Sequence, residues 1–145
     1  MPLGLIAFAA ACAFVGVGLY INIAEQPARL GLAPSAMMRE WTPSNRRGFV
    51  LLSALALLST ILAFAYYART GDIRWTIGGT IMLASGLYAY YVIEPVNFWL
   101  YTFEPEAPES VARELMRDWG LVEWGLTVIG LWACGIFAWA LVQAA

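Results

Sequence analysis

Four long apolar runs separate the polar residues of this chain, and they constrain its fold more than any other feature. The runs cover about residues 3–24, 49–67, 75–93 and 121–142, and none contains an internal Lys, Arg or Asp. A helix needs about 20 mostly apolar residues to cross a membrane, which is close to the length of each run. Only Glu123 brings a charge into a run, near the start of the last one. We therefore predict an all-α fold, a transmembrane four-helix bundle that forms a single integral membrane domain over residues 1–145.

The composition excludes several classes of function. Of the 145 residues, 61% are hydrophobic and 12% are charged, whereas soluble domains contain roughly 45–50% apolar and about 25% charged residues. The net charge of −2 is too small to indicate a nucleic-acid partner. The chain has no histidine, so it lacks the commonest general base near neutral pH and the commonest metal ligand. We expect membrane lipids as partners, and neither a metal nor a cofactor.

Prolines and turn residues mark the expected connections. An acid and a proline follow the first and third runs, at Glu25-Gln-Pro27 and Glu94-Pro95, so we expect these helices to end there and to be followed by long connections over about 25–48 and 94–119. The second connection is short and contains Gly71-Asp72, which is typical of a turn. The first run has no positively charged segment before it and no small-residue cleavage site after it, so we interpret it as a retained helix rather than a signal peptide.

The arginines predict an orientation. All eight basic residues are arginines, of which six lie in the first and third connections and two, Arg69 and Arg74, flank the second. Cytoplasmic loops carry an excess of basic residues. We therefore expect both termini to be non-cytoplasmic, in a bacterial inner membrane.

Small residues and an internal similarity concern the packing of the helices. Glycines occur in all four runs, and small residues allow close helix packing in lipid. Residues 18–27 and 86–95 both begin Gly-Leu-Tyr and end in proline, which suggests two repeated helical hairpins. Cys12 and Cys134 lie in apolar runs, where we interpret them as small core residues, although a disulfide stays open.

The topology predicts one polar end of the bundle. In an up-down-up-down bundle, the acids after the first and third runs and the acid early in the fourth run lie at the same membrane face. Our candidate catalytic bases are Glu123 first, then Glu94 and Glu25. The candidate ligand-binding residues share this face and are polar or aromatic: Asn22, Trp41, Arg46, Arg47, Tyr91, Asn97, Trp119 and Trp124. Such a set suits a flat, phenolic or quinone-like ligand. The alternative is that ion pairs between the carboxylates and Arg29, Arg46 or Arg47 only hold the first connection over the end of the bundle.

Four ordered blocks of sequence resemble the anthrone oxygenase-like family of small four-helix membrane proteins, a domain of unknown function. The blocks are residues 18–30 (GLYINIAEQPARL), residues 41–48 (WTPSNRRG), residues 94–100 (EPVNFWL) and residues 115–120 (LMRDWG). The resemblance implies a four-helix membrane fold and, in the fungal members, cofactor-free oxygenation of an anthrone to an anthraquinone. Family members usually carry a histidine and an arginine in the fourth helix, and this chain has Glu123 and Leu126 at those positions.

Two functions stay open at this stage. In the first, the protein binds or oxidises an aromatic or quinone-like molecule, with Glu123 as base and Arg46 or Arg47 beside a developing oxyanion. In the second, it is a non-catalytic accessory subunit of a larger membrane complex. The replaced histidine and arginine favour the second function, as do Trp132, Phe137 and Trp139 in the last run.

Overall fold

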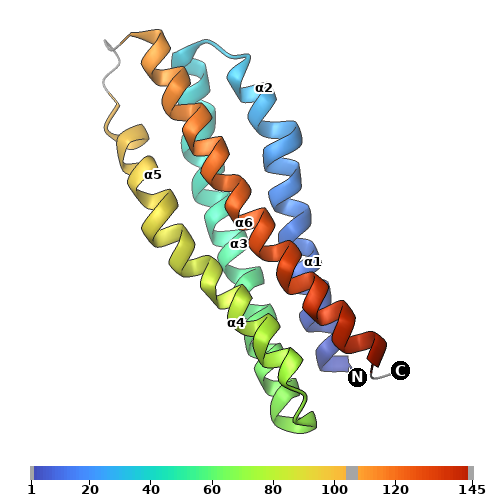
Figure 1. The fold of residues 1–145 in the computed structure, drawn as a ribbon. Coiled ribbons are helices and arrows are strands. Elements are labelled where there is room, and N and C mark those ends of the chain that lie inside the picture. The colour runs from blue at the N-terminus through green and yellow to red at the C-terminus, as the bar shows by residue number, and fades with distance from the viewer. Residues whose placement is uncertain (1, 104–107, 144–145) are drawn as a thin grey trace.

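The chain folds into four long helical rods that run alternately up and down (Figure 1). This computed structural model describes residues 2–103 and 108–143. The first rod is α1 (Pro2–Tyr20), η1 (Ile21–Glu25) and α2 (Gln26–Leu30), and the second is α3 (Pro34–Thr70). The third is α4 (Ile73–Tyr88), η2 (Ala89–Ile93) and α5 (Glu94–Tyr101), and the fourth is α6 (Glu109–Gln143). All four rods are long and apolar enough to cross a membrane, which confirms the predicted fold class.

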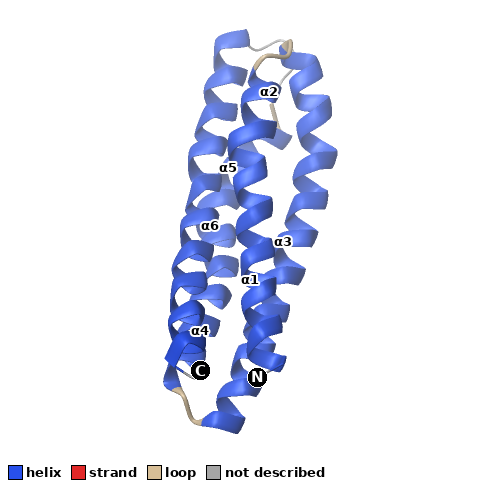
Figure 2. Ribbon diagram, turned by 90° about the vertical axis from the view of Figure 1, so that its right-hand side faces the viewer, coloured by secondary structure: helices blue, strands red, loops and turns tan. Residues whose placement is uncertain are grey.

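The rods form a closed ring in which each one packs on two neighbours. α1 packs on α3 and α6, and α4 packs on the same two helices from the other side. The start of α1 and the end of α6 lie at the end of the bundle that holds the α3–α4 turn, and the α2–α3 connection, the end of α5 and the start of α6 lie at the opposite end (Figure 2). Across the described residues the chain contains only helices and loops, as Figure 2 shows.

The first and third helices do not end at their acid-proline pairs, so this expectation is wrong. Both continue for one or two further turns, because a π-helical segment precedes each proline. In these segments the N–H of Gln26 donates to the carbonyl of Ile21, and the N–H of Glu94 donates to the carbonyl of Ala89. A π-helix bonds residues five apart and so widens the turn. The widened turn gives room for a proline that has no N–H and would otherwise crowd the preceding turn.

The first connection is also much shorter than we expected. Only residues 31–33 separate α2 from α3, and α3 begins at Pro34 and continues through Pro43. A proline is favourable in the first turn of a helix, where its missing N–H has no partner to lose. The last helix begins at Glu109, inside the expected third connection, and runs without a break to Gln143.

The turn between α3 and α4 has the residues that its geometry requires. Gly71 closes α3 in the left-handed conformation, with φ +71°, and donates its N–H to the carbonyl of Tyr67. Asp72 caps α4 by accepting from the backbone N–H of Arg74 at 3.1 Å. The Arg74 side chain also donates to Asp72, and these bonds lower the pKa of the Asp72 carboxyl. The predicted Gly-Asp turn is confirmed.

Two aromatic clusters fill the ends of the bundle. Near the α3–α4 turn, Trp75 lies 4.9 Å from Tyr66 and 5.2 Å from Phe137, measured between ring centroids. At the other end, Trp41 lies 4.9 Å from Tyr101 and 6.0 Å from Trp119. Between the clusters the helices approach through small residues, as the sequence predicts.

Cys12 and Cys134 face each other between α1 and α6. Their sulfur atoms lie 3.8 Å apart and both are free thiols. Cys12 is exposed on the surface of the bundle, so its interpretation as a core residue is wrong.

Candidate functional site

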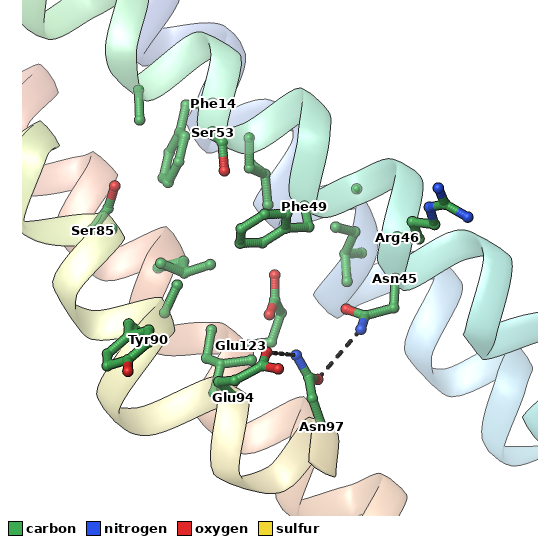
Figure 3. Close-up of a pocket in the computed structure, with 18 of the residues that line it drawn as sticks. Phe14, Asn45, Arg46, Phe49, Ser53, Ser85, Tyr90, Glu94, Asn97 and Glu123 are labelled. Atoms are coloured by element: carbon green, nitrogen blue, oxygen red, sulfur yellow. Dashed lines mark hydrogen bonds between the residues drawn. The ribbon is translucent and has the colours of Figure 1, made fainter. Parts of the chain in front are cut away.

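A cavity of about 630 Å³ lies between α3 on one side and α4, η2 and α5 on the other (Figure 3). Its floor comes from α1, η1 and α6, through Phe14, Ile21, Trp119, Glu123 and Leu126. Most of its wall is apolar, including Phe49, Leu52 and Leu57 from α3 and Met82, Leu83 and Ile93 from the third rod. A volume of this size is typical of a small-molecule site.

Glu123 is the most unusual side chain of the cavity wall. It comes from α6, where Trp119 stands one turn before it, and its exposed fraction is 4%. Figure 3 shows its carboxylate in the middle of the cavity, pointing toward Phe49. Among the residues that the structure describes, none donates a hydrogen bond to this carboxylate, which faces the cavity. A buried carboxylate without a partner is costly, so its position calls for a ligand or a proton.

Glu94 lines the same cavity as Glu123 and is held by a series of polar side chains. Asn97, one turn later on α5, donates from Nδ2 to Glu94 Oε2 at 3.1 Å. The indole N–H of Trp119 donates to Asn97 Oδ1 at 3.0 Å, and Asn45 Nδ2 donates to the same oxygen at 3.4 Å. This series of hydrogen bonds therefore fixes the orientation of the Asn97 amide and links α3, α5 and α6 at one end of the cavity (Figure 3).

Arg29 holds Glu25 at the same end of the cavity. The Arg29 side chain is almost fully buried and donates to Glu25 Oε1 at 2.5 Å, to Gln26 Oε1 at 3.0 Å and to both carboxylate oxygens of Glu40. Its guanidinium group also lies 5.2 Å from the ring centroid of Trp119. An arginine in such surroundings is stabilised by charge-assisted hydrogen bonds and by its contact with the aromatic ring.

The Arg29 cluster connects three rods. Ser44 of α3 donates a hydrogen bond to Glu25, which also receives the bond from Arg29. Gln26 donates from Nε2 to the carbonyl of Met116 at 2.6 Å, which ties η1 and α2 to α6. Both carboxylates near Arg29 therefore have partners, in contrast to Glu123.

The structure brings six of the eleven predicted site residues to the cavity: Glu25, Arg46, Glu94, Asn97, Trp119 and Glu123. All three candidate bases are among them. Arg46 stands at the edge, and Figure 3 shows its guanidinium group directed away from the cavity.

The other five predicted residues do not line the cavity. Asn22 of η1 donates to the carbonyl of Gly18 at 2.9 Å and to Thr127 Oγ1 at 3.0 Å, so it joins the first rod to α6. Trp41 is fully buried against Tyr101 and Trp119. The remaining three are on the outer surface, where they were not expected: Arg47, Tyr91 and Trp124. Helical periodicity explains the difference, because neighbours in sequence such as Glu123 and Trp124 point about 100° apart.

Sequence reasoning missed Gln26, Glu40, Ser44 and Asn45. Glu25 and Arg29 are four residues apart, which places them on the same face of a continuous helix. The spacing of Glu25 and Arg29 therefore predicts that the two side chains pair, but only if the helix continues through Pro27. The contribution of Glu40 and Ser44 depends on the helical path of α3 before residue 49, where we expected a connection.

The carboxylates that line the cavity offer proton and hydrogen-bond chemistry. In the described ranges, no group of three His, Cys, Asp or Glu side chains is placed to hold a metal ion. A carboxylate in an apolar cavity can accept a hydrogen bond or a proton from a weakly acidic group of a ligand. The apolar side chains around Glu123, among them Phe49 and Ile93, are compatible with a ring system.

In comparisons with family models, curated proteins and solved structures, nothing matched this chain.

Proposed function

We propose that this membrane protein binds a flat aromatic compound of phenolic or quinone-like character in the cavity, with Glu123 as the group that accepts its proton. The observation that carries the proposal is the buried Glu123 carboxylate, which faces an apolar cavity of about 630 Å³ without a hydrogen-bond partner in the described structure. A phenolic hydroxyl or an acidic C–H of an aromatic ketone would supply the missing partner.

Glu123 is better suited to this role than the other two candidate bases. Glu25 already accepts hydrogen bonds from Arg29 and Ser44, and Glu94 accepts one from Asn97. A carboxylate that is paired with a cation is a weaker base, because the pairing stabilises its charged form. Arg46 and Arg47 do not enter the proposal as oxyanion partners, since both are exposed on the outer surface.

The reaction that the sequence resemblance implies is compatible with this site. Transfer of a proton from the methylene carbon of an anthrone to Glu123 leaves an electron-rich enolate. Dioxygen is then the oxidant: it converts the methylene carbon to a carbonyl group, and the second oxygen atom leaves as water. The protein would supply a base and a cavity with mostly apolar walls.

The test uses the protein reconstituted in lipid nanodiscs and a hydroxylated anthrone as probe. We expect bound anthrone to show the absorbance of its enolate, and Glu123→Gln to remove this band and to weaken binding by about tenfold, the effect of losing one hydrogen bond to a charged group. Glu114→Gln is the matched control, because Glu114 is an exposed glutamate on the same helix. The proposal fails if the wild-type protein does not bind the probe, or if Glu123→Gln binds it with an unchanged spectrum. Formation of the anthraquinone under air, measured by chromatography, reports whether oxygenation follows.

A role as an accessory subunit is the second candidate. On the outer face of α6, Trp132 is 68% exposed beside a shallow hollow lined by Val128, Leu131, Gly135 and Ile136. An exposed aromatic side chain next to a hollow is suited to helix packing by a partner protein. Native mass spectrometry of gently solubilised membranes distinguishes the candidates, because an isolated monomer would contradict this second role.

A further inference from the structure

Resting on the proposed function, we propose that the ligand is a ring compound dissolved in the membrane, carrying an alkyl chain, and that it enters the cavity sideways from the lipid through a gap between α3 and the third rod. The alkyl chain of the ligand would stay in the gap and the lipid, while its ring lies beside Glu123.

The gap has an apolar rim that is open to the outside. Phe49 and Leu57 of α3 are 58% and 53% exposed, and Leu83 of α4 is 48% exposed. Tyr90 of η2 completes the rim at 68% exposed. All four line the cavity, so the same side chains border both the interior and the outer surface. A rim of this composition is compatible with lipid and would be unfavourable in water.

The gap lies within the part of the bundle that is embedded in lipid. The charged residues of α3 nearest to it are Arg46 and Arg47, which precede Phe49, and from there to Tyr67 the helix carries no charge. The opposite rim lies in the uncharged stretch from Trp75 to Ile93. Charged side chains stay near the membrane surface, so the opening faces the acyl chains.

Both ends of the gap are closed by contacts between the rods. Toward the α3–α4 turn, Thr60 donates to the carbonyl of Gly79 at 3.2 Å, where α3 packs directly on α4. Toward the polar end, Asn45 reaches Asn97 at 3.4 Å and Tyr101 at 3.3 Å. The Trp41 ring packs on Tyr101 behind this bridge. A ligand from the aqueous phase would have to part these contacts, whereas the lateral route is open.

Glycine at position 86 keeps the rim open. Gly86 lines the cavity, is exposed, and has no atom within 4 Å of the position of an added Cβ atom. A side chain at this position would project into the gap without a clash. Glycine has a low preference for a helix interior, so a larger residue here does not oppose the helix. The position therefore offers a substitution that obstructs the entrance while the fold is kept.

The experiment measures ligand exchange in lipid nanodiscs. The probes are a hydroxyanthraquinone with a decyl chain and a sulfonated, water-soluble anthraquinone that does not partition into lipid. Protein loaded with isotope-labelled decyl compound is mixed with an excess of the unlabelled compound, and the release rate is recorded for wild type, Gly86→Leu, Gly86→Phe and Gly16→Phe. Gly16 is the matched control, because it is an exposed helix glycine on α1 with nothing within 4 Å and does not line the cavity.

We expect a graded effect of side-chain size. Exchange should slow by a few-fold in Gly86→Leu and by about tenfold or more in Gly86→Phe, while Gly16→Phe exchanges at the wild-type rate, because an obstructed route changes rates. The sulfonated probe should bind at least tenfold more weakly than the decyl compound. Comparable helical content and thermal unfolding of all four proteins, measured by circular dichroism, show that the fold is retained.

Two outcomes would overturn the inference and leave the proposed function intact. In the first, Gly86→Phe releases the decyl compound at the wild-type rate while Glu123→Gln still binds it more weakly. In the second, the sulfonated probe binds as tightly as the decyl compound. Failure of the wild-type protein to bind either probe above protein-free nanodiscs would instead overturn the proposed function, and the inference with it.

Discussion

Arg29 and Glu123 are both buried charged residues, but they differ in whether the protein supplies hydrogen-bond partners for the charge. Both are within 4% of complete burial. Arg29 has hydrogen bonds to Glu25, Gln26 and Glu40, so its charge is compensated within the protein. Glu123 has no such bond in the described structure and faces open space. We therefore propose a structural role for Arg29 and a ligand-binding role for Glu123.

The structural role of Arg29 leads to a prediction at the residue scale. Arg29→Met leaves the partly exposed Glu25 and Glu40 carboxylates without their common cation, and we expect a loss of about 1–3 kcal/mol in the free energy of unfolding, as for polar groups that lose a hydrogen-bond partner. Unfolding in a mild detergent, followed by circular dichroism, measures this loss. Arg47→Ala is the control, because Arg47 is exposed, and should change stability by no more than about 0.5 kcal/mol.

A combined variant separates pairing from packing. Adding Glu25→Gln and Glu40→Gln to Arg29→Met removes the uncompensated charges, so part of the lost stability should return. Unchanged stability in Arg29→Met alone would contradict the assigned role.

At the scale of the elements, two π-helical segments stand at equivalent places in the first and third rods. Each begins three residues after the glycine of a Gly-Leu-Tyr sequence and ends two residues before a proline. The agreement supports the predicted similarity of the two helical hairpins. It also explains why Gln26 and Glu25, on the far side of the expected helix end, reach α6 and the cavity. π-helical turns often occur at functional sites.

Glycines at helix crossings give a prediction at this scale. A Cβ atom on Gly130 of α6 would lie 2.8 Å from both Phe14 Cδ1 and Val15 Cγ2 of α1, which is too close for carbon atoms. We expect Gly130→Ala to destabilise the protein by about 1–3 kcal/mol through overpacking. The measurement is the midpoint of thermal unfolding in detergent.

The matched substitution is Gly16→Ala on α1. Gly16 has no atom within 4 Å of an added Cβ, so alanine should be neutral or stabilise the helix by up to about 1 kcal/mol. Equal effects of the two substitutions would contradict the close α1–α6 contact at Gly130.

At the scale of the whole molecule, the charges divide the bundle into two unlike ends. The connections at residues 31–33 and after Tyr101 lie at the end with six arginines, and the α3–α4 turn and both termini lie at the other. The cavity opens between these ends, closer to the arginine-rich one. The asymmetry on which the predicted orientation rests therefore also predicts that the cavity lies nearer to one membrane surface.

The orientation is testable by labelling single cysteines in a background with Cys12→Ala and Cys134→Ala. Ser35 and Thr70 are exposed near opposite ends of α3. If the arginine-rich end is cytoplasmic, a membrane-impermeant maleimide added to bacterial spheroplasts should label Thr70→Cys at once and Ser35→Cys only after permeabilisation. Labelling in the reverse order would show that both termini are cytoplasmic.

The sequence by itself determined the number of helices, their membrane character, the Gly71-Asp72 turn and the meeting of Glu25, Glu94 and Glu123 at one cavity. These features follow from hydrophobic length, local turn chemistry and an alternating topology, which act within single segments or between neighbours in the chain. The helical path through Pro27 and Pro95 was not evident, because proline normally ends a helix and only the local geometry shows that a π-helical turn accommodates it.

Only the tertiary structure decided which of the polar side chains share the cavity. Tyr91 and Trp124 directly follow cavity residues in the sequence but point outward. The rotation of each helix about its axis decides which residues face the cavity. That rotation is set by packing contacts between distant segments, such as Gly130 against Phe14. The absence of a partner for Glu123 within the described structure, and the open gap beside Gly86, likewise depend on how four helices fit together, which no single segment of the sequence specifies.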